Sequence, residues 1–572
     1  MTHAIHRRAL FAQGVLALFC HAFAAEGLDS AASAARPWDL LIVNGHVVDG
    51  SGNPWFAADI GIREGRILAV GRLASQPARR RLDAHGLAVA PGFIDLHTHS
   101  DIPLLVNGTA DSMVRQGVTL NMLSEGDSIA PIQGEALNTT SGDAAATAKY
   151  LGIHVDWSTL TGYFDRLERQ GVSLNVGSYV GAGQVRACVL GNTQRDPTPA
   201  ELGRMRSLVR QTMEEGAFGL SSCLTDPPQM AAKTDELVEL AKVAAEYGGI
   251  YATHLRDYYD RLLEAVEEAV FIGERARLPV HIFHLTAYAD SSSRRMSAAI
   301  EMIEAARARG IDATANNYPY EWAMHPMLSF IPPWAHEGGM EALIQRLKDP
   351  QVRARLRREI GEGIPGWYNR IKLVGFDNIV FLSGSGAPKG FVNKSIAQIA
   401  RETAKDPHDA LFDLVMDVPN AMVIYKVRPE SAIRTLMKAP WQSFSTDGFG
   451  VPPAYPERQH PRSFGTFPRV LATYVREQRI LTLEEAVRRM TSLPAQVIGL
   501  RDRGLLREGF WADVVIFDPA RVADRATYDD PEQYPDGIEY VLVNGVVVVD
   551  HATHTGAKPG KILRGSGYGQ KR

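Results

Sequence analysis

Short apolar runs alternate with amphipathic helices through the middle of this chain, and this alternation constrains the fold more than any other feature. Parallel strands need crossover helices between them, so the alternation predicts an α/β fold with a parallel sheet. Eight strands that are each followed by a helix close into a (β/α)8 TIM-like barrel. The eight predicted strands are Gly92–Leu96, Gly117–Leu123, Ser173–Val180, Ala217–Ser222, Gly249–Thr253, Val280–His284, Ala313–Asn317 and Gln442–Ser445.

The segments between these runs carry helical signals. Apolar residues recur with a period of 3.6 in Ala231–Ala245 and Arg261–Ile272. Leu483–Met490 follows Thr482, and Glu485 stands three residues after that threonine, which is the pattern of a capping box. The connection after strand seven, residues 321–440, is too long for a simple loop, so we expect an inserted subdomain or lid.

The two ends of the chain share a local pattern. Leu40–Gly45 is followed by Val47–Gly50, and Tyr540–Gly545 is followed by Val546–Asp550. Each pair of β-rich runs is joined by Asn-Gly, a strong hairpin signal. We therefore expect both ends to form one small β-sandwich domain from residues 37–90 and 497–565, beside a barrel over residues 91–496.

The N-terminus has the pattern of a secretory signal peptide. His6-Arg7-Arg8 precedes the mostly apolar run Ala9–Phe23, and Ala22-Phe23-Ala24 has the small-x-small pattern of a cleavage site. The sequence predicts a signal peptide over residues 1–24 and export to the periplasm or the medium. An N-terminal amphipathic tail is the alternative.

Composition narrows the class of partner. The net charge is -4, from 61 basic and 65 acidic residues, which gives no reason to expect nucleic acid or an anionic membrane. Past the N-terminus no apolar run is long enough to span a bilayer. Only Cys188 and Cys223 follow the predicted cleavage site, enough for one disulfide but not for a disulfide framework. A small molecule is therefore the expected partner.

The first predicted strand ends in Asp95-Leu96-His97-Thr98-His99. Alternation along a strand places His97 and His99 on one face with Asp95, and in a barrel that face points inward. Two imidazoles at the carboxyl end of a strand can bind one metal ion. As an isolated match the motif is more often structural, but its place on the first of eight strands favours a metal pair.

Strands five and six each end at a histidine, His254 and His284. A single histidine of this kind is usually a satisfied core residue. Two of them, on consecutive strands and at the same end of the barrel, are better interpreted as ligands of a second metal site.

Two carboxylates follow other strands. Glu125 precedes a glycine turn after strand two, where it either bridges two cations or is a solvated loop acid. Asp447 follows strand eight, where it either exchanges a proton with an activated water or forms an Asp-Gly turn without chemistry. Because a metal lowers the pKa of water towards about 7, the whole set predicts a metal-dependent hydrolase.

Taken in order, these motifs resemble the amidohydrolase superfamily, and within it the N-acyl-D-amino-acid deacylases (D-aminoacylases). The likeness extends over nearly the whole mature chain. The matching stretches are Pro91–Ser100, Tyr251–Arg256, Asn317–Tyr320, Ser445–Gly448, His460–Phe467, Met490–Ala495 and Gly509–Asp518. The resemblance implies one or two zinc ions. It implies that His97 and His99 are the first-strand metal pair, His254 and His284 hold the tightly bound zinc, and Asp447 is the catalytic acid/base.

Three positions depart from the family pattern. Ser124-Glu125-Gly126 replaces an Asn-Cys-Gly turn, so Glu125 is the expected bridging ligand, as in a subgroup with Glu there. Thr286 stands where many members carry a lysine that helps bind the substrate carboxylate, and Gly181-Ala182-Gly183 replaces Gly-His-Gly. The remaining candidates for substrate binding, each equally compatible with a structural role, are Arg186, Arg256, Tyr318, His460 and Arg462.

The sequence therefore predicts hydrolysis of a linear amide, with an N-acyl-D-amino acid as the favoured substrate. Thr286 keeps open a different amide or ester on the same metal centre, such as a dipeptide, a cyclic amide, a lactone or a xenobiotic amide. A non-catalytic exported binding protein is a third hypothesis. The presence of Asp447 argues against it, since a binding protein needs no group for proton transfer.

Overall fold

The centre of the molecule is a closed barrel of parallel strands, in a computed structural model that describes residues 36–137, 148, 151–288, 292–384 and 386–570. One sheet holds β6 (Phe93–Thr98), β7 (Val118–Leu123) and β8 (Asn175–Ser178). The other runs in the order β17 (Gln442–Phe444), β13 (Ala313–Asn317), β12 (Val280–Ile282), β11 (Ile250–His254), β10 (Gly219–Cys223) and β9 (Val180–Gly181). The predicted signal peptide lies outside the described residues.

The two sheets join at both edges, so the barrel prediction is confirmed. A parallel bridge between Thr98 and Gly448 closes one seam. At the other seam, the predicted third strand is divided at Tyr179 into β8, which pairs with β7, and β9, which pairs with β10. The division lets one segment of chain turn from one sheet into the next.

Helices follow the barrel strands and cover them from outside. They are α2 (Pro103–Asn107), α3 (Asp111–Val114), α5 (Leu160–Gln170), α6 (Ala182–Leu190), α7 (Pro199–Glu214), α8 (Thr234–Glu246), α9 (Leu262–Ala276), α10 (Ser292–Ala308), α17 (Arg462–Arg469), α18 (Leu483–Met490) and α19 (Ser492–Val497). A π-helical segment, Val470–Glu477, continues α17. The predicted capping box of α18 is half formed: Thr482 accepts from the backbone N–H of Glu485, whose carboxylate instead binds Arg488 and Arg489.

The two chain ends meet in one sheet of nine strands. Its order is β21 (Thr553–His554), β20 (Val546–Asp550), β19 (Ile538–Val543), β18 (Val514–Phe517), β5 (Ala88–Pro91), β1 (Trp38–Val47), β2 (Phe56–Arg63) and β3 (Arg66–Gly71), with β4 (Ala78–Asp83) beside β1. Ile62 near one end and Leu542 near the other share a core, so the sheet folds over on itself as a β-sandwich. Along β18, Val514 and Ile516 pack into that core while Val515 and Phe517 pack into the barrel core.

One of the two predicted hairpins is wrong. Asn544-Gly545 does connect β19 to the antiparallel β20, and both residues have positive φ. Asn44, by contrast, lies within the single strand β1, where it forms a bulge against β2. Its backbone N–H and side-chain amide bind Asp59 and Asp83, so this Asn is held inside the sheet by neighbouring strands.

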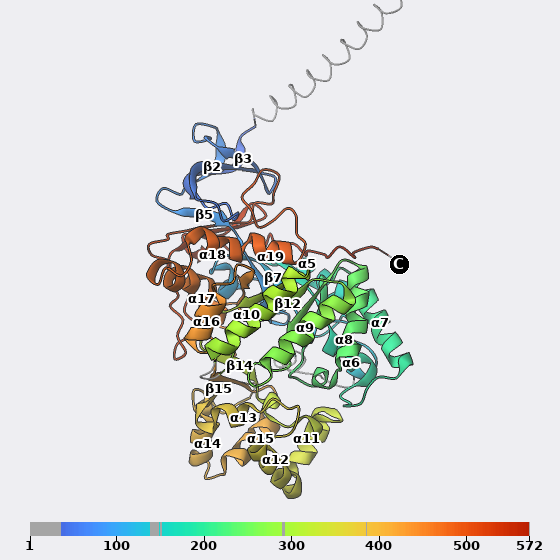
Figure 1. Cartoon of the computed structure of the whole chain (residues 1–572). Helices are drawn as coiled ribbons and strands as arrows, with labels where there is room; N and C mark the ends of the chain where they lie inside the picture. The colour runs from blue at the N-terminus through green and yellow to red at the C-terminus, as the bar shows by residue number, and fades with distance from the viewer. Residues whose placement is uncertain (1–35, 138–147, 149–150, 289–291, 385, 571–572) are drawn as a thin grey trace, which may run out of the picture.

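The long connection after β13 folds as an insertion at the end of the barrel away from the β-sandwich (Figure 1). Its strands form an antiparallel sheet in the order β14 (Trp322–Pro326), β16 (Met422–Lys426) and β15 (Ile379–Ser383). Its helices are α11 (Gly339–Lys348), α12 (Pro350–Glu362), α13 (Arg370–Val374), α14 (Ile396–Glu402), α15 (Pro407–Asp417) and α16 (Glu430–Leu436). The insertion therefore borders the end at which the barrel strands finish.

The cysteines and the helices test two further predictions from the sequence. Cys188 and Cys223 are both buried and both free, so the single disulfide that the sequence allowed is not formed. Within the described ranges, no helix combines the length and apolar character that a bilayer crossing requires.

Candidate metal centre and active site

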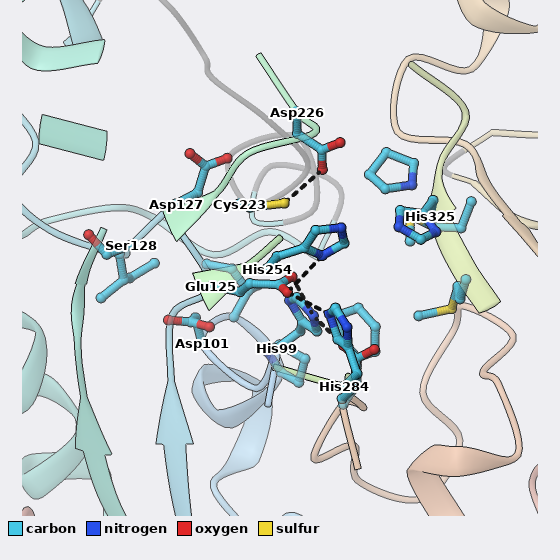
Figure 2. Close-up of a pocket in the computed structure, with 18 of the residues that line it drawn as sticks. His99, Asp101, Glu125, Asp127, Ser128, Cys223, Asp226, His254, His284 and His325 are labelled. Carbon is cyan, nitrogen blue, oxygen red and sulfur yellow. Dashed lines mark hydrogen bonds and ion pairs between the residues drawn. The ribbon is translucent and has the colours of Figure 1, made fainter. Parts of the chain in front are cut away.

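Five of the predicted site residues meet with Asp447 at the carboxyl ends of the barrel strands. They form two overlapping groups whose potential ligand atoms lie within 4.8 Å of one another. One group is His97, His99, Glu125 and Asp447, and the other is Glu125, His254 and His284. Figure 2 shows Glu125 beside His99, His254 and His284. A single carboxylate thus belongs to both groups, as a bridging ligand would.

Glu125 is close to a nitrogen of each of the four histidines. Its Oε1 lies 2.9 Å from Nε2 of His284, 3.1 Å from Nδ1 of His254 and 3.3 Å from Nε2 of His97. Its Oε2 lies 3.5 Å from Nε2 of His99. The carboxylate and the four rings come from the ends of four strands, β6, β7, β11 and β12, so only the closed barrel brings them together.

The donor set fits a divalent metal ion. Both ring nitrogens of His97 are buried and make no hydrogen bond to any described residue. Buried polar atoms are normally satisfied, so an orphaned imidazole beside three more imidazoles and a carboxylate indicates a missing ligand partner. Histidine nitrogen and carboxylate oxygen are ligands that zinc accepts. Among these residues, His97, His99, Glu125, His254 and His284 would hold the ion or ions.

Strained backbone marks the same strand ends. Ser124, His284 and Asp447 have φ angles of 81°, 34° and 50°, in the left-handed region that residues with a side chain seldom adopt. Such conformations cost of order 1–3 kcal/mol each and persist where the surrounding structure fixes them. Here the backbone N–H of His284 is held by the side chain of Asn316 at 2.6 Å.

Asp95 holds the first and last barrel strands together beneath the site. It accepts hydrogen bonds from the backbone N–H of His97 and from both the N–H and the hydroxyl of Thr446. Burial raises the pKa of Asp95 to about 7, although these hydrogen bonds oppose the rise. The residue acts on the site through position, because it fixes the turns that carry His97 and Asp447.

The carboxylate of Asp447 lies between the histidines and a guanidinium. Its Oδ1 is 3.0 Å from Nε2 of His99, and its Oδ2 accepts a hydrogen bond of 2.5 Å from Arg462. Burial favours the neutral acid, but the neighbouring side chains of Arg462, His97 and His284 outweigh it and hold the pKa of Asp447 well below its ordinary value. The carboxylate is therefore ionised and able to accept a proton.

The pKa values of Glu125 and His284 are also shifted, in the directions that favour the protonation states able to bind metal. Burial opposes ionisation of Glu125, but His97 and His254 hold its pKa well below the ordinary value. Burial lowers the pKa of His284 to about 4, so its ring is neutral near pH 7. A carboxylate and a neutral imidazole are the protonation states that metal coordination requires.

Three of the predicted substrate-binding residues gather around Asp447. Arg462 lines the pocket. The ring of Tyr318 lies under the guanidinium of Arg462 at 4.7 Å, and Nδ1 of His460 accepts from the backbone N–H of Arg462. Tyr318 and His460 are buried behind Arg462 and are absent from the described pocket lining, so they position the arginine.

Arg186 and Arg256 lie outside this pocket, and each pairs with a nearby carboxylate. Arg186 is fully buried and pairs with Glu236 at 2.5 Å. Arg256 binds Glu268 and donates to backbone carbonyls of Met230 and Ala232. Neither reaches the pocket that contains the histidines, because a local carboxylate holds each guanidinium outside it.

The positions that depart from the family pattern have structural surroundings. Thr286 is buried, and its hydroxyl has no hydrogen-bond partner among the described residues. Gly181 packs so tightly against Gly126 that a Cβ would lie 2.1 Å from its carbonyl oxygen. The same carbonyl accepts from the backbone N–H groups of Gly183 and Gln184, which fixes the turn that carries Glu125.

Sequence reasoning missed much of the pocket wall. Asp101, Asp127 and Asp226 line it from loops, and His325 lines it from β14 of the insertion. Asp101 and Asp127 each lie two residues from a predicted ligand, which was an available signal. No periodic pattern marks His325, because its role depends on where the insertion packs.

The arrangement suits hydrolysis of an amide. A divalent ion held by these donors would supply Lewis acidity, polarising a substrate carbonyl and making water a stronger acid. Asp447, ionised and anchored by Arg462, can accept a proton from the attacking water and deliver it to the leaving nitrogen. The buried walls exclude bulk water, which strengthens both electrostatic effects.

Comparison with known proteins agrees with this chemistry. The model of the "Amidohydrolase family" matches residues 80–549. The chain is 33% identical to a D-aminoacylase from Alcaligenes xylosoxydans xylosoxydans, over 93% of this chain and 98% of that protein.

Two solved structures extend the likeness to the fold. One is the N-acyl-D-glutamate deacylase from Bordetella bronchiseptica, complexed with zinc and a phosphonate inhibitor that mimics the tetrahedral intermediate. It is 32% identical with a TM-score of 0.77, over 92% of this chain and 100% of that chain. The other is a D-aminoacylase with a binuclear metal centre, described by one-metal activation and second-metal attenuation. It is 30% identical with a TM-score of 0.76, over 92% of this chain and 100% of that chain.

Proposed function

The chain belongs to the amidohydrolase family and is a hydrolase of amide C–N bonds, and from this premise we propose that it converts an N-acyl-D-amino acid and water to a carboxylate and a D-amino acid. The observation that carries the proposal is the shared Glu125 between two histidine groups, next to an ionised Asp447. Relatives with this activity align with nearly the whole chain, which supports the substrate class.

We propose zinc as the metal, with one or two ions per chain. His254, His284 and Glu125 form the more buried group, which favours them as the tighter site. His99 is partly exposed, with 30% of its side-chain surface accessible, so the group that contains it should bind more weakly. The B. bronchiseptica relative that binds zinc supports the choice of metal.

The test is hydrolysis of N-acetyl-D- and N-acetyl-L-amino acids by the purified mature enzyme, before and after treatment with a chelator and after zinc is restored. The proposal predicts release of D-amino acids only, lost on chelation and recovered with zinc. Metal content measured on the same samples distinguishes one ion from two. A folded, zinc-loaded enzyme that releases no amino acid from any substrate would refute the substrate class.

A second candidate is hydrolysis of another amide or an ester on the same metal centre, such as a dipeptide, a cyclic amide, a lactone or a xenobiotic amide. The pocket wall favours it, because Asp101, Asp127 and Asp226 line the pocket while its guanidinium, Arg462, is engaged by Asp447. Such a wall would disfavour an anionic substrate unless another group offsets the charge. The same assay, extended to these compounds, separates the two candidates.

We also propose that the protein is exported. The basic start at His6-Arg7-Arg8, the apolar run after it and the small-x-small sequence ending at Ala24 support a cleaved signal peptide. N-terminal sequencing of the mature protein should begin near residue 25, and activity should fractionate with the periplasm or the medium. An intact N-terminus on active enzyme would contradict export by this route.

A further inference from the structure

The insertion contributes one histidine to the pocket that belongs to neither metal-ligand group. His325 lies on β14, is only 8% exposed and lines the pocket. Its ring is perpendicular to that of His254, with the ring centres 5.6 Å apart. Figure 2 shows His325 on the opposite side of the pocket from Asp101 and Ser128, with His254 between it and Glu125.

A chain of hydrogen bonds fixes which nitrogen of His325 carries the proton. Nε of Arg370 lies 3.1 Å from the hydroxyl of Tyr425, which lies 2.9 Å from Nδ1 of His325. A guanidinium can only donate, so the tyrosine oxygen accepts from Arg370 and gives its single proton to Nδ1. The ring then carries its own proton on Nε2.

The Nε2–H group is left as a donor for a ligand. No described residue accepts a hydrogen bond from it. His336, a second buried histidine of the insertion, differs, because its Nε2 binds the backbone carbonyl of Ile331. An oriented N–H donor at the wall of a reaction pocket is suited to an acceptor oxygen of the substrate.

Arg370, at the start of this chain of hydrogen bonds, is a buried cation without an ion pair. Its side chain is 1% exposed, its Nη1 donates to the carbonyl of Ser329, and its Nη2 has no partner among the described residues. Asp226 acts on it only through space. A buried charge that lacks a counter-ion is costly, so an anion arriving near His325 would be stabilised by it.

We propose that His325 is a specificity-determining residue that donates a hydrogen bond from Nε2 to the α-carboxylate of an N-acyl-D-amino acid, with the buried charge of Arg370 behind it. This inference rests on the proposed function. It gives the anionic group of the substrate a place on the insertion, away from Asp101 and Asp127. Tyr425 and Arg370 are positioning residues, because they act through His325.

The test compares N-acetyl-D-leucine with N-acetyl-D-leucinamide, which has the same shape but no negative charge. Wild-type enzyme should prefer the acid in kcat/KM. His325→Phe keeps a ring beside His254 but has no donor, and it should raise KM for the acid by about 10–100-fold, the range of one charge-assisted hydrogen bond, while KM for the amide changes little. Tyr425→Phe should reduce the preference by a smaller factor, and His325→Gln should restore part of it.

The matched control is His336→Phe, which removes a buried histidine of the same insertion outside the pocket. It should change stability and leave the ratio of acid to amide unchanged. If His325→Phe alters both substrates equally, or neither, while circular dichroism shows a folded protein, the proposal is overturned.

A binding experiment separates this proposal from the proposed function. Calorimetric titration of the zinc-loaded Asp447→Asn protein with N-acetyl-D-leucine and its amide measures affinity without turnover. Preference for the acid that depends on His325 supports the anion site even if wild-type enzyme hydrolyses neither compound. Equal affinity for the two, or no binding of either, overturns the anion site whether or not the enzyme is active.

Discussion

Two buried ion pairs of the same length serve different purposes in this molecule. Arg462 meets Asp447 at the mouth of the barrel, and Arg186 of α6 meets Glu236 of α8, each at 2.5 Å. Both arginines are almost completely buried. The sequence offered them as equal candidates for substrate binding, so burial and a short ion pair do not by themselves mark a functional residue.

The surroundings distinguish the two pairs. Arg186 also donates to the backbone carbonyls of Thr193 and Arg195, and its carboxylate partner has no histidine beside it among the described contacts. Asp447 faces a pocket, touches His99 and has a φ of 50°. In this molecule, the pair at the active site has an open side and a strained backbone, whereas the structural pair is enclosed by backbone carbonyls.

The largest expected effect is the loss of turnover when Asp447, the carboxylate of the pair that faces the pocket, is replaced. Asp447→Asn keeps the shape but removes the proton acceptor, so kcat should fall by roughly 10²–10⁴-fold, the usual contribution of a general acid–base. Steady-state kinetics on zinc-loaded protein checks this, with metal content and circular dichroism as controls. Unchanged turnover in the variant would also revive the hypothesis of a non-catalytic binding protein.

The opposite result is expected at the enclosed pair. Arg186→Met leaves Glu236 buried without its partner, which should lower the free energy of unfolding by about 3–5 kcal/mol. The kinetic constants of the remaining folded enzyme should be those of the wild type, because Arg186 lies outside the pocket. Urea unfolding and steady-state kinetics test the two halves. A rise in KM without loss of stability would place Arg186 in substrate binding after all.

His336 is a buried titratable group outside the pocket, and we expect it to affect stability but not catalysis. Burial lowers its pKa from 6.5 to about 4. The folded state therefore favours the neutral ring. The stabilisation is complete above about pH 6.5, is lost as the pH falls towards about 4, and amounts to about 3 kcal/mol.

The check on His336 is the urea midpoint of wild type and His336→Gln between pH 7 and pH 4.5. The wild type should lose more stability than the variant over this range. Parallel pH profiles for the two proteins would show that His336 does not contribute.

The smallest effect concerns a contact remote from both ion pairs. Thr482 caps α18 by accepting from the backbone N–H of Glu485 at 3.2 Å. Thr482→Ala should lower the free energy of unfolding by about 1 kcal/mol and leave kcat and KM unchanged. Thermal unfolding measures the loss, and Thr482→Ser should recover it. A kinetic effect of this substitution would mean that a loss of stability far from the pocket also changes activity. The kinetic effects at Asp447 and Arg186 could then not be assigned to their own contacts.

The barrel and the residues at its strand ends could be predicted from local sequence patterns. The barrel strands are short, and an ionisable side chain stands at or just after the carboxyl end of several of them, as at His254 in β11 and Asp447 after β17. The apolar run of β18 is continuous because one face packs on the β-sandwich core and the other on the barrel core.

Contacts between distant segments determine which of two similar local sequences takes which role. The two Asn-Gly sequences are alike locally, yet Asp59 and Asp83 hold Asn44 inside a strand while Asn544 turns a hairpin. In the same way, Arg186 and Arg462 differ only in what surrounds them, and His325 reaches the pocket because β14 packs at the barrel mouth. Periodicity reports local structure and burial, whereas these partners come from segments distant in the chain, which local patterns do not encode.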